Sequence, residues 1–225
     1  MVSARRWLGR VALVTTLFAP ALARADTQDW EVNEVVTRVG GDAAVRYVEL
    51  HSGPGGCLFP SSRVEAFDGE GRSLGADAPA VGTDCYGPDT YVLLATPAAQ
   101  ATFATAADHG LVPPLPADVG QVCFSSSATR YDCVRWGAVT TAVTDFFAPD
   151  DITSAPAAAD GQALVRVATS HVVAVDWDAA GPTPRGPNDG TPWTPPDAGP
   201  TADAAPVGDA ASVDASGSAD GAVGD

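Results

Sequence analysis

The segment RYDCVRWGAV, residues 130–139, combines residue types that could support nucleophilic chemistry. Cys133 follows an acid and lies close to Arg130 and Arg135, and a positive neighbour lowers the pKa of a thiol. A catalytic thiol also needs an adjacent base such as histidine. A disulfide to a second cysteine would remove the nucleophile altogether. A reactive Cys133 is therefore the less favoured interpretation.

Strand geometry offers a second interpretation of this segment. Side chains alternate between the two faces of a strand, so Arg135 shares the face of Cys133, whereas Asp132, Val134 and Trp136 point the other way. We expect Trp136 to pack in the core and Asp132 to be satisfied by a hydrogen bond at a strand edge. The pattern thus favours a structural role for the whole segment.

The cysteines of the chain are Cys57, Cys85, Cys123 and Cys133. Cys123 and Cys133 lie on successive predicted strands joined by SSSATR, and Cys57 and Cys85 flank the segment RVEAFD and the loop after it. We expect disulfides Cys57–Cys85 and Cys123–Cys133, each contributing roughly 3 to 4 kcal/mol in the loop-entropy model. The sequence lacks the Cys-x-x-Cys spacing that is typical of a zinc site, and its histidines are far apart along the chain. We expect no metal and no cofactor.

Familiar catalytic motifs are missing from the sequence. It contains no Gly-x-Ser-x-Gly elbow, no His-Glu-x-x-His and no phosphate-binding glycine loop. His51, His109 and His171 could be combined with Ser52 or Ser170 into a triad, but nothing in the sequence fixes their mutual geometry. We expect no catalytic role for these histidines.

Pairs of acids offer another route to catalysis. Glu31 with Glu34, or Asp150 with Asp151, could in principle serve glycoside hydrolysis. Solvated acids without a catalytic role are the expected interpretation in so acidic a chain.

The turn DGEGRS, residues 68–73, places Asp68 and Glu70 at alternating positions. An EF-hand reading would put Arg72 at the fifth position and Pro79 at the twelfth, where a carboxylate is required. We expect a plain hairpin turn. A looser calcium site made of carbonyls and carboxylates remains open.

The elements that must position these residues are mostly strands. Alternating or continuous apolar residues between Gly, Pro and Asp predict strands at 30–39, 45–51, 63–68, 91–95, 120–124, 131–139, 163–168 and 171–175. The first two form a hairpin across a Gly-Gly-Asp turn. Only residues 96–110 favour a helix, and residues 69–90 and 104–118 are expected to be long loops. The pattern predicts an all-β antiparallel sandwich or barrel.

Several short motifs follow one another in a recognisable order. They are NEV at 33–35, YVEL at 47–50, FDGEG at 67–71, YVLLA at 91–95, Gly120 before a strand, DCVRWG at 132–137, LVR at 164–166 and PTPRGPN at 182–188. In this order they resemble the lamin tail domain of nuclear lamins and many secreted bacterial proteins. The resemblance implies an immunoglobulin-like antiparallel β-sandwich of a typically non-enzymatic kind.

Both ends of the chain differ in composition from its middle. Residues 1–25 combine arginines, a short apolar run and a final Ala-Arg-Ala, which predicts a secretory signal peptide. Residues 189–225 are rich in Pro, Ala, Gly and Asp, which predicts a disordered linker or tail. Residues 26–188 are expected to form one domain between them. This layout is similar to that of secreted proteins of myxobacteria and their relatives.

Charge and composition limit the function. The chain carries 28 acidic and 12 basic residues, a formal net charge of −16, which excludes nucleic acid and anionic membrane surfaces as electrostatic partners. No segment after the signal peptide is expected to span a membrane. We expect a secreted or cell-surface protein.

The favoured function is a non-catalytic binding or scaffold module of the cell envelope or extracellular space. Its sandwich loops would contact a protein or a glycan. Trp177 and Trp193 are the aromatic residues that look most exposed, and they could stack on a sugar, lie against the domain or stay loose in solvent. The alternative is a secreted hydrolase of unrecognised type that uses acidic loop residues, with activity dependent on Glu49 or Asp84. The missing catalytic motifs favour the binding module.

Overall fold

The structure is a computed structural model that describes residues 29–188. The expected signal peptide, residues 1–25, and the expected tail, residues 189–225, lie outside the described residues. Strands make up most of the regular structure, which confirms the prediction of an all-β fold. Within residues 29–188, neither helix has the length or the apolar character that a membrane crossing requires.

The strands form two main sheets and a small hairpin sheet. The larger sheet has the order β12, β11, β1, β2, β7, β8, which span Trp177–Ala180, Ala163–Arg166, Glu31–Val36, Tyr47–Ser52, Thr90–Ala95 and His109–Gly110. The smaller sheet has the order β10, β9, β4, β5, which span Thr129–Trp136, Gly120–Ser126, Ser62–Asp68 and Ser73–Asp77. β3 (Gly56–Leu58) pairs with β6 (Asp84–Tyr86). Neighbouring strands are antiparallel except β7 and β8, which are parallel.

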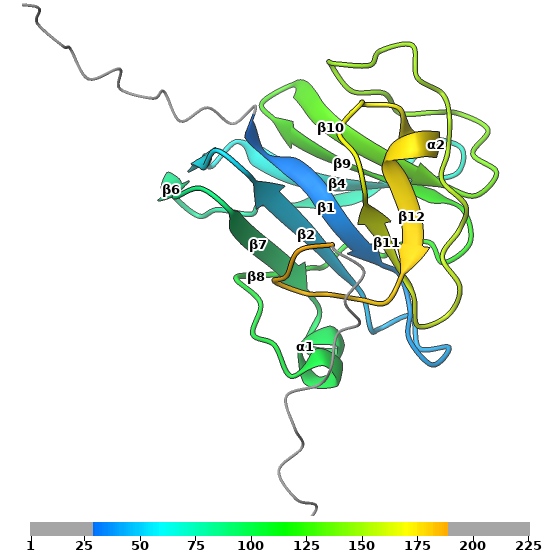
Figure 1. Cartoon of the computed structure of the whole chain (residues 1–225), viewed down its shortest axis with the longest axis horizontal. Helices are drawn as coiled ribbons and strands as arrows, with labels where there is room; N and C mark the ends of the chain where they lie inside the picture. The colour runs from blue at the N-terminus through cyan, green and yellow to red at the C-terminus, as the bar shows by residue number, and fades with distance from the viewer. Residues whose placement is uncertain (1–28, 189–225) are drawn as a thin grey trace, which may run out of the picture.

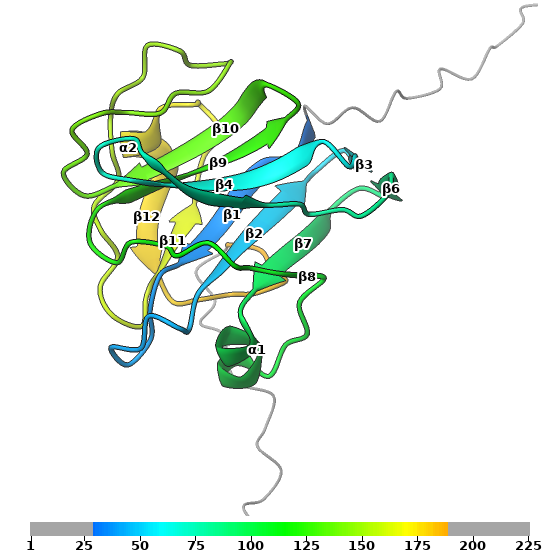
Figure 2. The same cartoon turned by 180° about the vertical axis from the view of Figure 1, so that it is seen from behind.

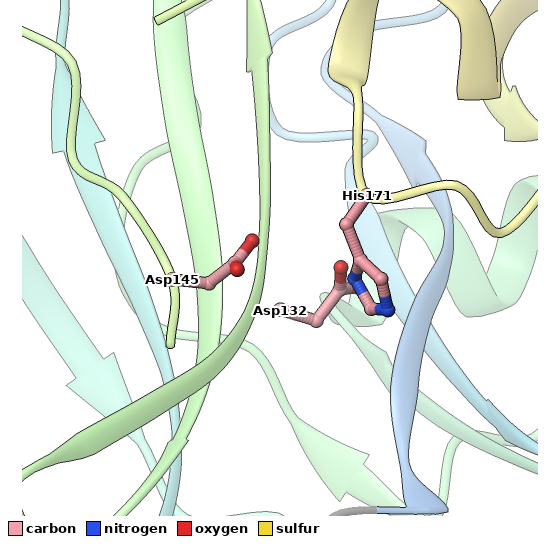
Figure 3. A group of neighbouring side chains, drawn as sticks. All are labelled: Asp132, Asp145 and His171. Atoms are coloured by element: carbon pink, nitrogen blue, oxygen red, sulfur yellow. The ribbon is translucent and has the colours of Figure 1, made fainter. Parts of the chain in front are cut away.

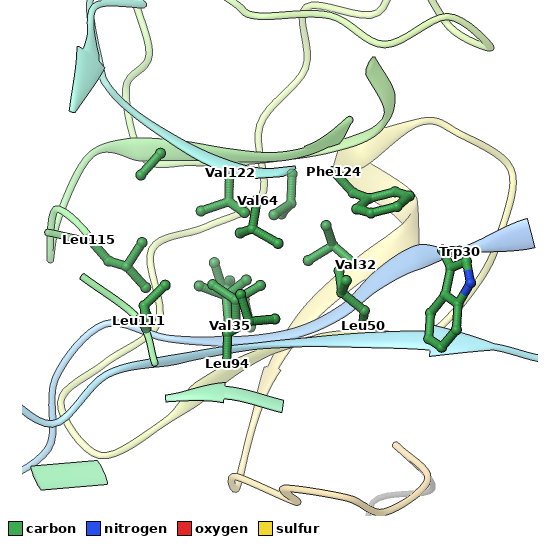
Figure 4. Packing of buried hydrophobic residues seen from close by; sticks show 14 of the residues in the cluster. Trp30, Val32, Val35, Leu50, Val64, Leu94, Leu111, Leu115, Val122 and Phe124 are labelled. Atoms are coloured by element: carbon green, nitrogen blue, oxygen red, sulfur yellow. The ribbon is translucent and has the colours of Figure 1, made fainter. Parts of the chain in front are cut away.

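The two main sheets lie face to face, as Figures 1 and 2 show from opposite sides. Apolar side chains of both sheets fill the space between them (Figure 4), among them Val35 and Leu94 from the larger sheet and Val122 and Phe124 from the smaller one. Alternation of side chains along each strand sends every second residue into this layer. The core therefore lies between the sheets. The other strand residues point to the outer faces of the sheets.

Trp136 is fully buried in this core, as its strand parity predicted. Its indole nitrogen donates a hydrogen bond of 3.0 Å to the carbonyl of Pro116. β9 begins with a glycine for a steric reason, because a Cβ atom on Gly120 would lie 2.7 Å from the indole ring. The close contact between Trp136 and Gly120 therefore sets how β9 and β10 pack against each other at this end of the hairpin.

Both disulfides join the pairs expected from the sequence. Cys57 bonds to Cys85 across the β3–β6 hairpin, and Cys123 bonds to Cys133 across the β9–β10 hairpin. The second bridge is buried against Phe67 on the face of the smaller sheet that points away from the core. Cys133 is thus half of a cross-strand bridge.

Four predicted segments differ from the structure. Residues 171–175 were expected to form a strand, but the short helix α2 (Val173–Asp176) starts there, because Asp176 accepts hydrogen bonds from the backbone N–H groups of Ser170 and Val172 and closes a tight turn. The predicted helix at 96–110 is only α1 (Pro97–Phe103), which Thr96 caps. The expected loops at 69–90 and 104–118 contain the short strands β5, β6 and β8.

The outer face of the larger sheet, which points away from the core, is also covered. α1 packs Ala99 and Phe103 against Tyr47, Leu93 and their neighbours. After β12 the chain returns across this face as residues 181–188, which we call the C-terminal strap (orange in Figure 1). The strap corresponds to the motif PTPRGPN, and it covers two glutamates of the sheet.

Candidate functional site

A buried group of charged side chains lies where β10 approaches the larger sheet. Asp132 of β10 accepts hydrogen bonds through Oδ2 from the backbone N–H of Val32, at 2.7 Å, and from the guanidinium of Arg166. The sequence predicted that a hydrogen bond satisfies Asp132 at a strand edge, and β10 is indeed the edge strand of the smaller sheet. The residue is nevertheless only 2 % exposed, because it links the two sheets. A register shift between Arg130 and Asp132 accompanies this position.

Arg166 at the end of β11 is the central cation of this group. Its guanidinium also lies 3.4 Å from Glu31 and 3.9 Å from Asp176, and it donates to the carbonyl of Val32 at 2.8 Å. Burial lowers the pKa of Arg166, but the carboxylates of Asp132 and Glu31 outweigh burial, so its pKa is raised overall. Arg166 therefore stays charged and holds several acids together.

Trp177 lies directly beside this arginine. The guanidinium carbon is 4.8 Å from the centroid of the indole ring, which is the geometry of a cation–π contact. The sequence left open whether Trp177 stacks on a sugar or lies against the domain, and the structure shows the second arrangement, because the side chain is only 4 % exposed. Trp193, the second aromatic residue proposed for that role, lies outside the described residues.

Asp145 and His171 complete the group next to Asp132 (Figure 3). One carboxylate oxygen of each aspartate and one imidazole nitrogen of His171 all lie within 4.8 Å of one another. Asp145 comes from the loop after β10, and His171 comes from the turn before α2. Burial raises the pKa of Asp145. Two carboxylates and an imidazole are donors that a metal ion can use.

The loop that carries Asp145 is fixed by a second buried arginine. Arg135 donates to the carbonyls of Val143 and Thr153, both at 2.8 Å, and forms a 2.6 Å ion pair with Asp151. Asp151 also accepts a hydrogen bond from the backbone N–H of Val173 at 3.0 Å. The segments 143–153 and 167–175 are thereby fastened to each other and to β10.

Apolar side chains on these two segments face solvent. Six of the eight exposed large apolar residues within residues 29–188 belong to them, namely Phe146, Phe147, Ile152, Val167, Val172 and Val175, which we call the apolar loop surface. Phe147 stacks on the ring of His171 at 5.0 Å and packs edge-on against Phe146 at 5.4 Å. This surface therefore adjoins the Asp132, Asp145 and His171 group.

A cleft of about 520 Å³ with a mixed polar and apolar lining opens beside Arg166. Its lining includes Glu31, Asn33, His51 and the segment 166–169. Burial raises the pKa of Glu31. The cleft shares Val167 with the apolar loop surface, so the two features are continuous at this end of the sheets.

Glu34 and Glu49 form a separate acidic pair under the C-terminal strap. They lie opposite each other on β1 and β2 and are fully buried. Glu34 accepts hydrogen bonds from Thr183, and Glu49 accepts them from Asn33 and from the backbone N–H of Arg185. Burial raises the pKa of Glu34 to about 7, and burial with the nearby charge of Glu34 raises the pKa of Glu49 to about 8.

The acids proposed for glycoside hydrolysis do not form the pairs that the sequence suggested. Glu34 binds the strap, whereas Glu31 faces Arg166 from the other end of β1. Asp151 is held by Arg135, and its neighbour Asp150 is exposed. The expectation that all four are solvated was therefore wrong for Glu34 and Asp151.

The histidines proposed for a triad lie on separate elements. His51 stacks on Tyr91 on β7, His109 lies on β8, and His171 belongs to the buried acidic group. The hydroxyl of Ser170 donates to Asp176 at 2.6 Å and so serves the turn before α2. The sequence gave no sign that His171 approaches Asp132 and Asp145, because 26 and 39 residues separate them and they belong to three elements.

The Asp68–Glu70 turn has the hydrogen bonds of a hairpin turn. Asp68 accepts hydrogen bonds of 2.9 Å from the backbone N–H groups of Glu70 and Arg72 through one oxygen. Arg72 forms ion pairs with both acids. The guanidinium of Arg72 thus lies beside both carboxylates, where a calcium ion would otherwise have to bind.

Comparison with protein-family models, curated proteins and solved structures finds no match to this chain.

Proposed function

We propose that this chain is a non-catalytic exported binding module whose apolar loop surface docks on another protein. The single observation that carries the proposal is the concentration of exposed Phe, Ile and Val side chains on segments 143–153 and 167–175. Soluble proteins seldom leave such residues together in water unless they form a contact surface. The two disulfides support export, because such bonds persist in oxidising compartments.

A protein partner fits this surface better than a glycan does. Sugars are bound by aromatic rings together with a dense set of hydrogen-bonding side chains, but Ile152, Val172 and Val175 offer only aliphatic groups. The aromatic residue expected to stack on a sugar, Trp177, is buried under Arg166. The partner is therefore a cell-envelope or extracellular protein with an apolar contact face.

The fold underlying this module is proposed to be the immunoglobulin-like sandwich of lamin tail domains. The order of motifs along the chain supports this assignment, as do the two facing sheets and the strap formed by PTPRGPN. Such domains are typically non-enzymatic. A hydrolase remains the alternative, but Glu49, one of its two proposed acids, is fully buried beneath the strap.

A capture experiment with matched variants tests the proposal. The exported protein is immobilised, exposed to envelope fractions, and compared with the variant Phe146→Ser, Ile152→Ser. The control is Val81→Ser, Val112→Ser, whose side chains lie elsewhere and are at least as exposed. We expect one defined partner that the wild type and the control retain and the loop variant loses. Equal retention by the loop variant, or turnover of a glycoside, phosphoester or peptide substrate, would contradict the proposal.

A further inference from the structure

The side chains of Asp132, Asp145 and His171 come from three elements that meet only in the folded protein. Asp132 lies on β10, Asp145 lies in the following loop, and His171 precedes α2. Their nearest ligand atoms are within 4.8 Å of one another, and both aspartates are more than nine-tenths buried. Figure 3 shows the imidazole ring and both carboxylates directed toward a common space.

The imidazole of His171 supplies a second, independent observation. Its Nδ1 atom is buried, and it has no hydrogen-bond partner. Leaving such an atom unsatisfied costs roughly 1 to 3 kcal/mol, so a buried nitrogen normally has a partner. The ring is nevertheless held in place by the stack on Phe147, and the backbone of His171 adopts the left-handed conformation with φ 61°. One ring nitrogen of His171 is thus held within 4.8 Å of both carboxylates.

Each aspartate is positioned through one oxygen only. Asp145 uses Oδ1 to accept hydrogen bonds from the backbone N–H groups of Phe147 and Ala148, at 3.0 and 2.8 Å. Asp132 uses Oδ2 for Val32 and Arg166. The described residues give no hydrogen bond to the other oxygen of either carboxylate. Outer contacts of this kind orient metal ligands and leave one oxygen for the ion.

The balance of charge around the three residues also favours a cation. Asp132, Asp145 and Asp176 are buried together with the partly buried Glu31, and the group is faced by Arg166. The other nearby buried arginine, Arg135, is paired with Asp151. Buried charges are tolerated when they are paired or bind a metal. Arg135 also interacts electrostatically with Asp145 and Asp132, so two arginines face five acids, and the acids remain in excess.

We propose that Asp132, Asp145 and His171 bind a divalent transition-metal ion of the Zn²⁺ class, with water at the remaining position. An imidazole nitrogen with two carboxylate oxygens suits Zn²⁺, whereas Ca²⁺ and Mg²⁺ take oxygen ligands. In a tetrahedral zinc site the ligand atoms lie about 3.3 Å apart, so binding draws the three side chains closer together. The ion would fasten segments 143–153 and 167–175 to β10.

Calorimetric titration of the full exported protein, stripped with EDTA and free of any tag, tests this site with ZnCl₂ as the probe. We expect one zinc ion per chain, a higher melting temperature in zinc, and little response to CaCl₂ or MgCl₂. The variants His171→Gln and Asp145→Asn should bind zinc more than about 100-fold more weakly. The controls His109→Gln and Asp150→Asn change a histidine on β8 and an exposed acid of the same loop, and they should bind as the wild type does.

The site is rejected if zinc does not bind at millimolar concentration, or if both His171→Gln and Asp145→Asn bind it normally. X-ray absorption of the zinc-loaded wild type keeps the test independent of whether those variants fold. We expect one imidazole nitrogen and otherwise oxygen atoms bonded to the zinc. Sulfur ligands, or an ion held by oxygen alone, would overturn the assignment. Zinc binding at this site needs no protein partner. A failure to bind zinc would therefore leave the proposed docking function standing, and a failure to dock on a partner would leave the zinc site standing.

Discussion

Arg166 shows how much a single side chain can organise in this protein. It contacts three acids and one indole ring, and it is buried between β1, β10 and α2 at the edge of the cleft. A buried ion pair adds little net stability when it is complete, because both charges lose their hydration. Removal of one partner is a different matter, since the remaining charge stays buried without compensation. The structure therefore depends on Arg166 being present.

Replacement of this arginine gives the first prediction. Arg166→Met should lower the free energy of unfolding by about 3 to 5 kcal/mol, because Asp132 and Asp176 would remain buried beside an apolar side chain. Arg130→Met is the matched control, since its ion pair with Glu65 is partly exposed and should cost less than about 1 kcal/mol. Urea unfolding of both variants measures the difference. Equal losses would show that Arg166 is not the centre of the group.

The acids under the strap give a pH dependence. The pKa values of Glu34 and Glu49 are about 7 and about 8 in the folded protein, above their ordinary value of 4.5. The folded state therefore binds more protons than the unfolded state between these values, so stability is greatest below about pH 4.5 for these two groups and falls as the pH rises to about 8. The loss amounts to about 1.4 kcal/mol per unit of pKa difference.

Glu49→Gln tests this dependence directly. The amide carries no charge, so the variant should lose less stability than the wild type between pH 5 and pH 9, and it should be the more stable protein at pH 9. Unfolding by urea across this range measures both slopes. A wild type whose stability rises steadily from pH 5 to pH 9, or a variant with an unchanged slope, would show that these carboxylates are not kept protonated by burial.

At the scale of elements, the two hairpins carry disulfides in different surroundings. Cys123 and Cys133 are buried against Phe67, whereas Cys85 is exposed on β6. Reduction requires a thiolate to reach a sulfur atom, so access controls its rate. We predict that mild reductant opens Cys57–Cys85 first and Cys123–Cys133 only when the β9–β10 hairpin unfolds.

Timed alkylation followed by peptide mass mapping checks this order. Labelled Cys57 and Cys85 should appear well before labelled Cys123 and Cys133, and full reduction should lower the melting temperature by many degrees. A free, alkylatable Cys133 in the untreated exported protein would restore the possibility of a nucleophilic thiol. Simultaneous opening of both bridges would contradict the proposed protection of the second one by packing.

The elements that sequence patterns predicted well are runs of alternating or continuous apolar residues bounded by turn residues. β1, β2, β4, β7, β9, β10 and β11 all fall within or close to the predicted strands, and the parity of Cys133 and Trp136 on β10 was correct. Local alternation cannot show which polar side chain will be turned inward. Asp132 is buried because Arg166 and Val32 arrive from another sheet, and the sequence around Asp132 contains no trace of them.

Contacts with distant segments also explain why the sequence predicted neither the helix α2 nor the burial of Trp177. The run HVVAV has strong strand propensity, but hydrogen bonds from Ser170 and Val172 to Asp176 override it. Trp177 precedes a polar tail in the sequence, yet β12 pairs with β11 and carries it onto Arg166. The His171 group was invisible because it needs three distant segments. Long-range contacts of this kind follow from tertiary packing alone.

At the scale of the whole molecule, the features with potential function gather at one end. The cleft beside Arg166, the Asp132, Asp145 and His171 group and the apolar loop surface are contiguous there. The opposite end of the larger sheet holds α1, whose apolar face is packed against the sheet. The formal net charge of −16 repels anionic surfaces, so the proposed docking relies on the apolar side chains.

Hydrogen–deuterium exchange on the purified protein, alone and with the partner isolated by capture, tests the central claim most directly. Docking on the apolar loop surface predicts slower exchange in residues 143–153 and 167–175, with the backbone of β3 and β6 unchanged. The variant Phe146→Ser, Ile152→Ser should show no such protection. Protection confined to β3, β6 or the C-terminal strap, or none at all while the partner is bound, would contradict the assignment of this surface.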